Sequence, residues 1–112
     1  MVLYEREETV VMDIRRIPWS GDHSPGEGLL KRNLVTEGWD VKLWRDPSDR
    51  AYEEHAHPKD ESLWVIRGAI VLQVDGQEFR LGPGDRLMLP KGTVHSAQAG
   101  PDGATYWIGQ RD

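Results

Sequence analysis

The sequence predicts an all-β fold, either a sandwich or a barrel of antiparallel strands. Short stretches in which apolar and polar side chains alternate with a period of two recur along the chain. Turn residues separate these stretches at regular intervals, because the 112 residues include 12 Gly and 7 Pro. No stretch shows sustained helical periodicity. The length fits one domain that covers residues 1–112.

The composition narrows the class of protein. Hydrophobic residues make up 38% and charged residues 29%, which is typical of a globular chain. The absence of Cys excludes disulfides and thiolate ligands, and the first residues lack the apolar core of a signal peptide, so a cytoplasmic protein is expected. The net charge of −5 without a basic cluster argues against nucleic acid as a partner. No apolar run approaches the length of a membrane span, so no membrane partner is expected.

The first third of the chain is predicted to hold two strands around one loop. Residues 1–9 are expected to be frayed, and Thr9–Ile17 alternates, though imperfectly, as a first strand. Residues 18–28 contain two Pro and three Gly and are predicted to form a loop, in which His23 is interpreted as a solvated side chain. Leu29–Thr36 is predicted to be the second strand.

The rest of the chain reads as a series of short strands. Trp39–Arg45 alternates cleanly, with Trp39, Val41 and Leu43 on one face. Asp46–Arg50 is predicted to be a polar turn. Tyr52–His57 is predicted to be extended because a following proline disfavours helical backbone. The remaining predicted strands are Glu61–Arg67, Ala69–Val74, Gln77–Leu81, Arg86–Leu89, Thr93–Ala97 and Ala104–Gln110. Gly68 is predicted to separate the first two of them, and a two-residue hairpin turn is predicted at Asp75-Gly76. Further turns are predicted at 82–85, 90–92 and 100–103.

One stretch carries the strongest chemical pattern. His55 and His57 are two residues apart, so on a strand they point to the same face. Glu61 is at an even offset from both and begins a strand whose next inward positions, Leu63 and Val65, are apolar. A carboxylate on an apolar face is unfavourable unless something compensates its charge, and a bound cation does so.

A further histidine completes the candidate site. His95 follows a turn of Pro and Gly, which can deliver it beside His55 and His57. Three imidazole nitrogens and one carboxylate oxygen are a ligand set for one divalent transition metal. Such donors do not choose among Mn, Fe, Ni, Cu and Zn.

Two motifs in this region resemble those of the cupin superfamily. Residues 55–68 carry the pattern His-x-His-x3-Glu-x6-Gly, and residues 84–95 carry Gly-x5-Pro-x-Gly-x2-His. Two positions depart from the family pattern: Asp49 stands where a glycine is usual, and Ala99 stands where an asparagine is frequent. Neither position supplies a metal ligand.

The resemblance implies a small single-domain cupin, a monocupin, with an antiparallel jelly-roll β-barrel, also called a double-stranded β-helix. It also implies a metal held by His55, His57, Glu61 and His95. Four protein ligands leave coordination positions open to a substrate.

Other side chains are candidates for supporting roles. Glu53 shares the parity of the two histidines, so we expect either an acid–base group or a partner that orients an imidazole N–H, unless it lies on the rim in solvent. Leu63 is expected to line a substrate pocket. Tyr106 and Trp107 are adjacent on the last strand, so only one of them can face that pocket.

The leading functional hypothesis is a metal-dependent enzyme that acts on a small polar or aromatic molecule. The resemblance implies activities that include those of dioxygenases, isomerases and decarboxylases, and among them dioxygenase-like or isomerase-like chemistry is expected. The metal would act as a Lewis acid or bind dioxygen. The alternative is a non-catalytic cupin module that senses or binds a small ligand around a structural metal.

A homodimer is also expected. Trp44, Trp64, Ile66 and Val71 are assigned to outward positions, which places much apolar surface on the outside of the barrel. A second chain would cover this surface. The competing interpretation is that the N-terminal part of the same chain covers it.

Overall fold

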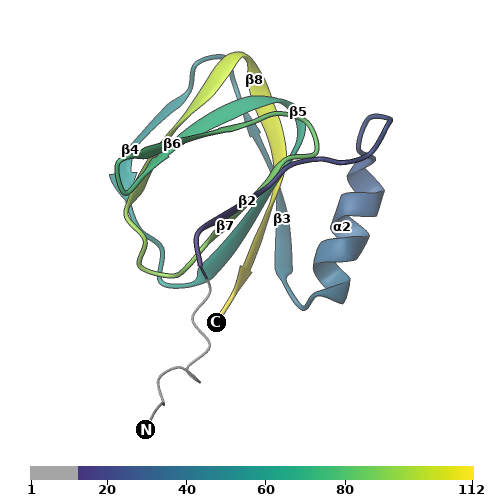
Figure 1. The fold of residues 1–112 in the computed structure, drawn as a ribbon, viewed down its shortest axis with the longest axis horizontal. Helices are drawn as coiled ribbons and strands as arrows, with labels where there is room; N and C mark the ends of the chain where they lie inside the picture. Colours follow the sequence, from purple (N-terminus) through teal and green to yellow (C-terminus); the bar gives the residue numbers. More distant parts are fainter. Residues whose placement is uncertain (1–12) are drawn as a thin grey trace, which may run out of the picture.

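The computed structural model describes residues 13–112, which form one antiparallel sheet and one helix (Figure 1). The expected fraying of residues 1–9 lies outside this part of the chain, and β2 covers only the end of the predicted first strand. The elements are β2 (Arg15–Ile17), α2 (Glu27–Thr36), β3 (Asp40–Asp46), β4 (Ala51–His55), β5 (Asp60–Val74), β6 (Gln77–Leu81), β7 (Arg86–Leu89) and β8 (His95–Arg111).

The sheet is built around the long pair β5 and β8, which are hydrogen-bonded from end to end. One half of the sheet has the order β2-β7-β5-β8-β3, and in the other half β6 pairs with β5 and β4 pairs with β8. The strands curve around a common interior (Figure 1). The predicted antiparallel all-β fold is confirmed. The barrel is not closed, since no backbone pairing joins β3 to β4 in residues 13–112.

The long pair bends at two glycines. The sequence predicted a break at Gly68 and a turn at 100–103, but both β5 and β8 continue through these points. Gly68 and Gly103 each have a φ of 77°, and the β5–β8 register shifts on either side of Gly68. A Cβ on Gly68 would lie 2.1 Å from the carbonyl oxygen of Gly103. The glycines therefore allow a close backbone approach and a bend without ending either strand.

The hairpin between β5 and β6 forms where the sequence predicts it. Val74 pairs with Gln77 across the two-residue turn. Asp75 and Gly76 both have positive φ, 52° and 78°, as the type I′ turn requires.

The main core fills the space between the two halves of the sheet. It combines alternate side chains of β5 with inward side chains of its neighbours. The buried members are Leu63, Val65, Ile70, Leu72, Val74, Leu81, Leu87, Leu89, Ala99, Ala104 and Tyr106.

The predicted strand Leu29–Thr36 is wrong, because these residues belong to helix α2. Leu30 and Leu34, one turn apart, are both fully buried, which makes a narrow apolar stripe. Gly38, with a φ of 94°, follows the last turn, and the N–H of Trp39 donates to the carbonyl of Leu34. The spacing of the two leucines and the following glycine are helix features that the local apolar run obscured.

Helix α2 covers the outer face of the sheet beside β3 (Figure 1). Ile66, assigned above to a dimer interface, is only 4% exposed because it packs under Leu30 and Leu34 in a second core cluster. Trp64 packs against the same cluster. The chain thus covers Ile66 and much of Trp64 itself, which was the competing interpretation. Val71 is half-buried, and the homodimer stays a prediction.

The face assigned to β3 is also corrected. Trp44 was placed on the outside, but Val41 and Leu43 face helix α2, and Trp44 lines the interior cavity described below. The predicted alternation of the two faces along β3 was correct, but the faces assigned to the inside and the outside of the sheet were exchanged. The physical reason is the helix, because it supplies a second apolar layer that β3 can pack against.

An ion pair between the buried Arg86 and the exposed Glu37 attaches the end of α2 to the sheet. The Arg86 guanidinium donates to Ser62 Oγ at 2.7 Å and to the carboxylate of Glu37, just after the helix. These hydrogen bonds hold the pKa of Glu37 below its usual value. No helix within residues 13–112 is long and apolar enough to cross a membrane.

We predict that Gly68→Ala lowers the free energy of unfolding by about 3 kcal/mol or more, because the new Cβ collides with backbone. Gly76→Ala is the matched control: its φ of 78° is nearly the same, but a Cβ there meets no atom within 4 Å. It should cost about 1–2 kcal/mol. Urea unfolding of the three proteins measures the difference. Equal losses of unfolding free energy in the two variants would contradict the predicted collision and would show that Gly68 is needed only for its positive φ.

Candidate metal centre

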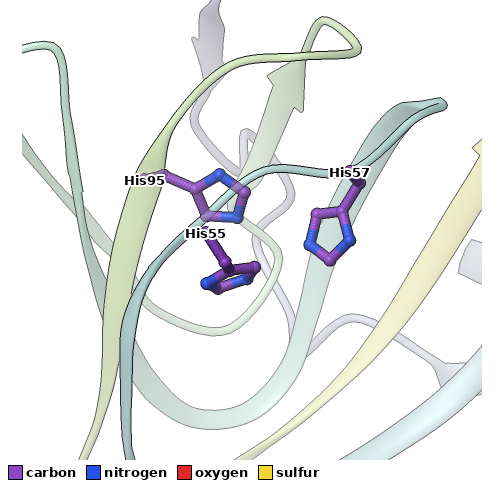
Figure 2. Close-up of side chains that lie close together, drawn as sticks. All are labelled: His55, His57 and His95. Carbon is purple, nitrogen blue, oxygen red and sulfur yellow. The ribbon is translucent and has the colours of Figure 1, made fainter.

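Three histidines from separate segments meet at one end of the cavity (Figure 2). His55 ends β4, His57 lies in the following loop, and His95 begins β8 opposite His55 in the β4–β8 register. One ring nitrogen of each lies within 4.8 Å of the others. The ring centroids are 4.4 Å apart for His55 and His95 and 5.3 Å apart for His57 and His95. The expected convergence of these histidines is what the structure shows.

Backbone carbonyls orient two of the rings. Nδ1 of His55 lies 2.7 Å from the carbonyl oxygen of Glu53, and Nδ1 of His95 lies 2.9 Å from that of Thr93. A carbonyl oxygen can only accept, so each Nδ1 carries a proton, and in the neutral form of the ring Nε2 is then the nitrogen with the lone pair. Burial lowers the pKa of His95, which favours the neutral ring that a metal requires.

Glu61 approaches the histidines from β5. It is only 4% exposed, and its Oε1 lies 3.6 Å from Nε2 of His57. Two atoms bound to one ion at roughly 2.1 Å each can be no more than about 4.2 Å apart, so this separation suits two ligands of the same metal. Its other oxygen, Oε2, accepts a hydrogen bond from Gln110 Nε2 at 2.6 Å. The carboxylate is therefore held beside His57, but it lies outside the group of three histidines whose ligand atoms are all within 4.8 Å of one another.

The two sequence motifs are tied together by backbone hydrogen bonds. The N–H of Gly92 donates to the carbonyl of His57 at 2.8 Å, and the N–H of Lys91 donates to Asp60 Oδ1 at 2.8 Å. The turn that precedes β8 thus rests on the loop that carries His57. This contact brings His95 to the first motif.

A cavity of about 310 Å³ extends from the histidines into the interior. Leu63 and Tyr106 line it, while Trp107 faces the helix and donates from Nε1 to the carbonyl of Glu27. The adjacent aromatic residues of β8 thus divide between the two faces, as parity requires. The lining residues are Asp40, Val41, Lys42, Trp44, Tyr52, His55, His57, Glu61, Leu63, Ile70, Leu72, His95, Ala97, Tyr106, Ile108 and Gln110.

A buried carboxylate organises the far wall of the cavity. Asp46 accepts hydrogen bonds from the hydroxyl groups of Tyr52 at 2.5 Å and Tyr106 at 2.6 Å and from the indole of Trp44 at 3.0 Å. We call these four residues the Asp46 cluster. Burial and the neighbouring carboxylate raise the pKa of both tyrosines, and that of Tyr106 most strongly.

Glu53 contributes its backbone rather than its side chain. Its carbonyl orients His55, whereas its carboxylate is exposed and does not line the cavity. The Glu53 side chain was a candidate orienting partner for an imidazole. In the structure the backbone carbonyl of Glu53 orients the ring of His55 instead.

Sequence reasoning missed several residues of the site. Gln110 shares the parity of Tyr106 and Ile108, and it pairs with Glu61 across β5 and β8. The contact between Gln110 and Glu61 follows only from the register of β5 and β8, which is a property of the folded sheet. Asp46 was assigned to a polar turn, and the tyrosines that bury its charge lie on other strands.

The Asp46 cluster predicts a loss of stability at alkaline pH. Because the folded pKa values of Tyr52 and Tyr106 are raised, their contribution is complete below pH 10 and falls as pH rises past 10, where the unfolded tyrosines ionise. The loss approaches about 1.4 kcal/mol per pH unit for each tyrosine that stays protonated. Urea unfolding at several pH values measures it. Tyr106→Phe should flatten the curve more than Tyr52→Phe, and equal curves for all three proteins would contradict the argument.

Comparison with known proteins agrees with this geometry. The family described as Cupin domain matches residues 43–108. Quercetin 2,3-dioxygenase of Bacillus subtilis (strain 168) is 38% identical over 48 residues, which is 43% of this chain and 14% of that protein. The chain therefore spans a small part of that relative's length.

Solved structures agree on the fold. KdgF from Halomonas sp. superposes with a TM-score of 0.58 at 20% identity, over 97% of this chain and 94% of that one. DMSP lyase DddQ from Ruegeria pomeroyi DSS-3 has a TM-score of 0.60 at 25% identity, over 64% of this chain and 37% of that one. Salicylate 1,2-dioxygenase from Pseudoaminobacter salicylatoxidans, in complex with gentisate, has a TM-score of 0.58 at 17% identity, over 62% of this chain and 19% of that one. With the matched family covering more than half of its length, the chain belongs to the cupin family.

Proposed function

We propose that this protein holds one divalent transition-metal ion with His55, His57, His95 and Glu61 and acts as an enzyme on a small molecule in the adjoining cavity. The observation that carries the proposal is the convergence of three imidazoles at the cavity wall, two of which hold Nδ1 against a backbone carbonyl so that Nε2 is the nitrogen available to a metal. The bound metal would supply a Lewis acid or a site for dioxygen.

The chain's own residues prepare this site. The carbonyls of Glu53 and Thr93 hold the rings of His55 and His95, and Gln110 holds the carboxylate of Glu61. The histidine nitrogens lie up to 4.8 Å apart, about 0.6 Å beyond the roughly 4.2 Å limit for two atoms bound to one ion, so the rings would have to move closer together to bind it. The apolar wall, with Leu63, limits water around a bound substrate.

Dioxygenase-like chemistry is the first choice and isomerase-like chemistry the second. Two of the similar proteins are dioxygenases, quercetin 2,3-dioxygenase and salicylate 1,2-dioxygenase. The matches cover 14% and 19% of those chains, so they support a reaction class and leave the substrate open.

Metal content tests the proposal directly. The purified protein should contain about one Mn, Fe, Ni, Cu or Zn ion per chain by elemental analysis, and His55→Ala or His95→Ala should weaken metal binding by at least about 100-fold. His23→Ala is the matched control, because His23 is exposed in the loop before α2 and lies apart from the cluster. A wild-type protein that binds none of these ions would refute the metal site.

Glu61 is tested separately as the fourth ligand. Glu61→Gln keeps the shape and removes the charge, and it should reduce metal affinity about 10- to 100-fold in calorimetric titration. Glu53→Gln should leave the affinity unchanged, because the exposed carboxylate of Glu53 does not line the cavity. Equal affinities for Glu61→Gln and the wild type would leave a site of three histidines.

Turnover separates the enzyme from a binding module. Protein loaded in turn with each of the five metals is assayed for oxygen uptake and for isomer formation with a panel of small polar and aromatic compounds. We expect metal-dependent turnover that disappears in His95→Ala. A loaded protein that binds panel compounds but converts none would favour the non-catalytic, ligand-binding alternative.

A further inference from the structure

The inner face of the sheet beside the metal centre is ordered in rows across three strands. Glu61 of β5 pairs with Gln110 of β8, which pairs with Asp40 of β3. The next row, two residues along each strand, runs from Leu63 through Ile108 to Lys42. All six residues line the cavity. The register therefore places Lys42 one row beyond the carboxylate at the metal centre.

Trp44 and Tyr106 follow in the third row, and both also line the cavity. The side chain of Trp44 is 38% exposed although its indole N–H is bound to Asp46. Its ring therefore offers an aromatic surface beside Lys42. An aromatic or apolar body packs well on such a ring.

Few hydrogen-bond donors on this wall remain available to a ligand. The indole of Trp44 and the hydroxyl groups of Tyr52 and Tyr106 are all committed to Asp46. The amide of Gln110 already donates to Glu61. Lys42 is the one Lys or Arg side chain in the lining, and it makes no ion pair with any residue in the range 13–112. An acid group of a ligand would find its partner there.

The charges of the cavity select the same ligand, on the condition that the proposed metal is present. The ion contributes two positive charges and Lys42 one, while Asp40 and Glu61 contribute one negative charge each. The histidines are neutral as ligands. Asp46 adds a third negative charge directly behind Tyr52 and Tyr106, so the loaded cavity is neutral overall. Because Lys42 has no ion-pair partner among the described residues, the positive charge at that part of the wall favours an anionic group of a ligand there.

The dimensions favour a small ligand. Two strand spacings and one row separate the Cα atoms of Glu61 and Lys42 by about 12 Å along the sheet. The cavity volume of about 310 Å³ is near the lower limit of the roughly 300–1,000 Å³ found for small-molecule pockets. A compound with one ring, or of similar size, spans such a site.

We infer that the cavity takes a small monocarboxylate with an aromatic or apolar body, whose acid group pairs with Lys42 while the body lies along Trp44 and points to the metal centre. Lys42 is then the residue that selects anionic ligands. This inference rests on the proposed metal site and adds the chemical class of its substrate.

Benzoate and its neutral analogue benzamide are suitable probes, because they share a shape and differ in charge. Each is titrated by calorimetry into the protein loaded with Zn²⁺, whose stoichiometry is measured on the same samples. Lys42→Met should weaken benzoate binding roughly tenfold and leave benzamide binding unchanged. Arg45→Met is the matched control: Arg45 is exposed on the same strand and does not line the cavity, so both affinities should stay at the wild-type values.

The outcomes separate this inference from the metal proposal. Loaded protein that binds no benzoate, or that binds it equally well with and without Lys42, overturns the inference while the metal site stands. If the chain takes up neither Zn²⁺ nor any of the other four ions, the metal proposal fails and the titration is repeated with the metal-free protein. Benzoate binding that still depends on Lys42 then supports the anion site, and its absence overturns it.

Discussion

The bend shared by β5 and β8 is the constraint on which the site depends. The two strands pair antiparallel from end to end, so Glu61 and Gln110 lie at one end of the pair and Val74 and His95 lie at the other. In a flat ribbon these ends would be far apart. The bend at Gly68 folds them toward each other, and Glu61 and His95 then line the same cavity. A local backbone conformation thus determines whether a distributed set of ligands can meet.

Once the segments meet, the backbone itself sets the orientation of the rings. His55 and His95 both place Nδ1 against the carbonyl oxygen of the residue two positions earlier. This short-range contact requires no additional side chain, and it directs both Nε2 atoms into the cavity. Glu61 needs a longer-range partner, which Gln110 provides from β8. The candidate metal centre therefore combines two histidines that are oriented locally with a carboxylate whose position depends on strand register.

The sequence predicted the residues of the candidate site better than their surroundings. The spacing within the two motifs and the turn before the second motif pointed to His55, His57, Glu61 and His95. Strand parity was only part of the reason, because His57 lies in the loop after β4. Parity could divide β3 into two faces, but it could not say which face points inward. That depends on helix α2, which packs over Val41 and Leu43 and whose two buried leucines were too few for the pattern to be recognised. Tertiary packing decided what the local pattern left open.

Contacts between strands were beyond the reach of such reasoning. The roles of Gln110 and Lys42 follow from the pairing of β8 with its two neighbours, and that register is a property of the folded sheet. The Asp46 cluster is similar, since its members come from three strands and its central residue was assigned to a polar turn. A buried carboxylate becomes favourable only when its donors are present, and those donors lie up to 60 positions away in the chain.

The Asp46 cluster also explains how the sheet can remain open on one side. β3 and β4 both pair with β8, but no backbone hydrogen bonds join them to each other within residues 13–112. Asp46 and Trp44 of β3 contact Tyr52 of β4 through side chains at this opening. A full ladder of backbone bonds would have closed the barrel and enclosed the cavity. Side-chain contacts at one end of the gap thus hold the two strands together where backbone pairing is missing.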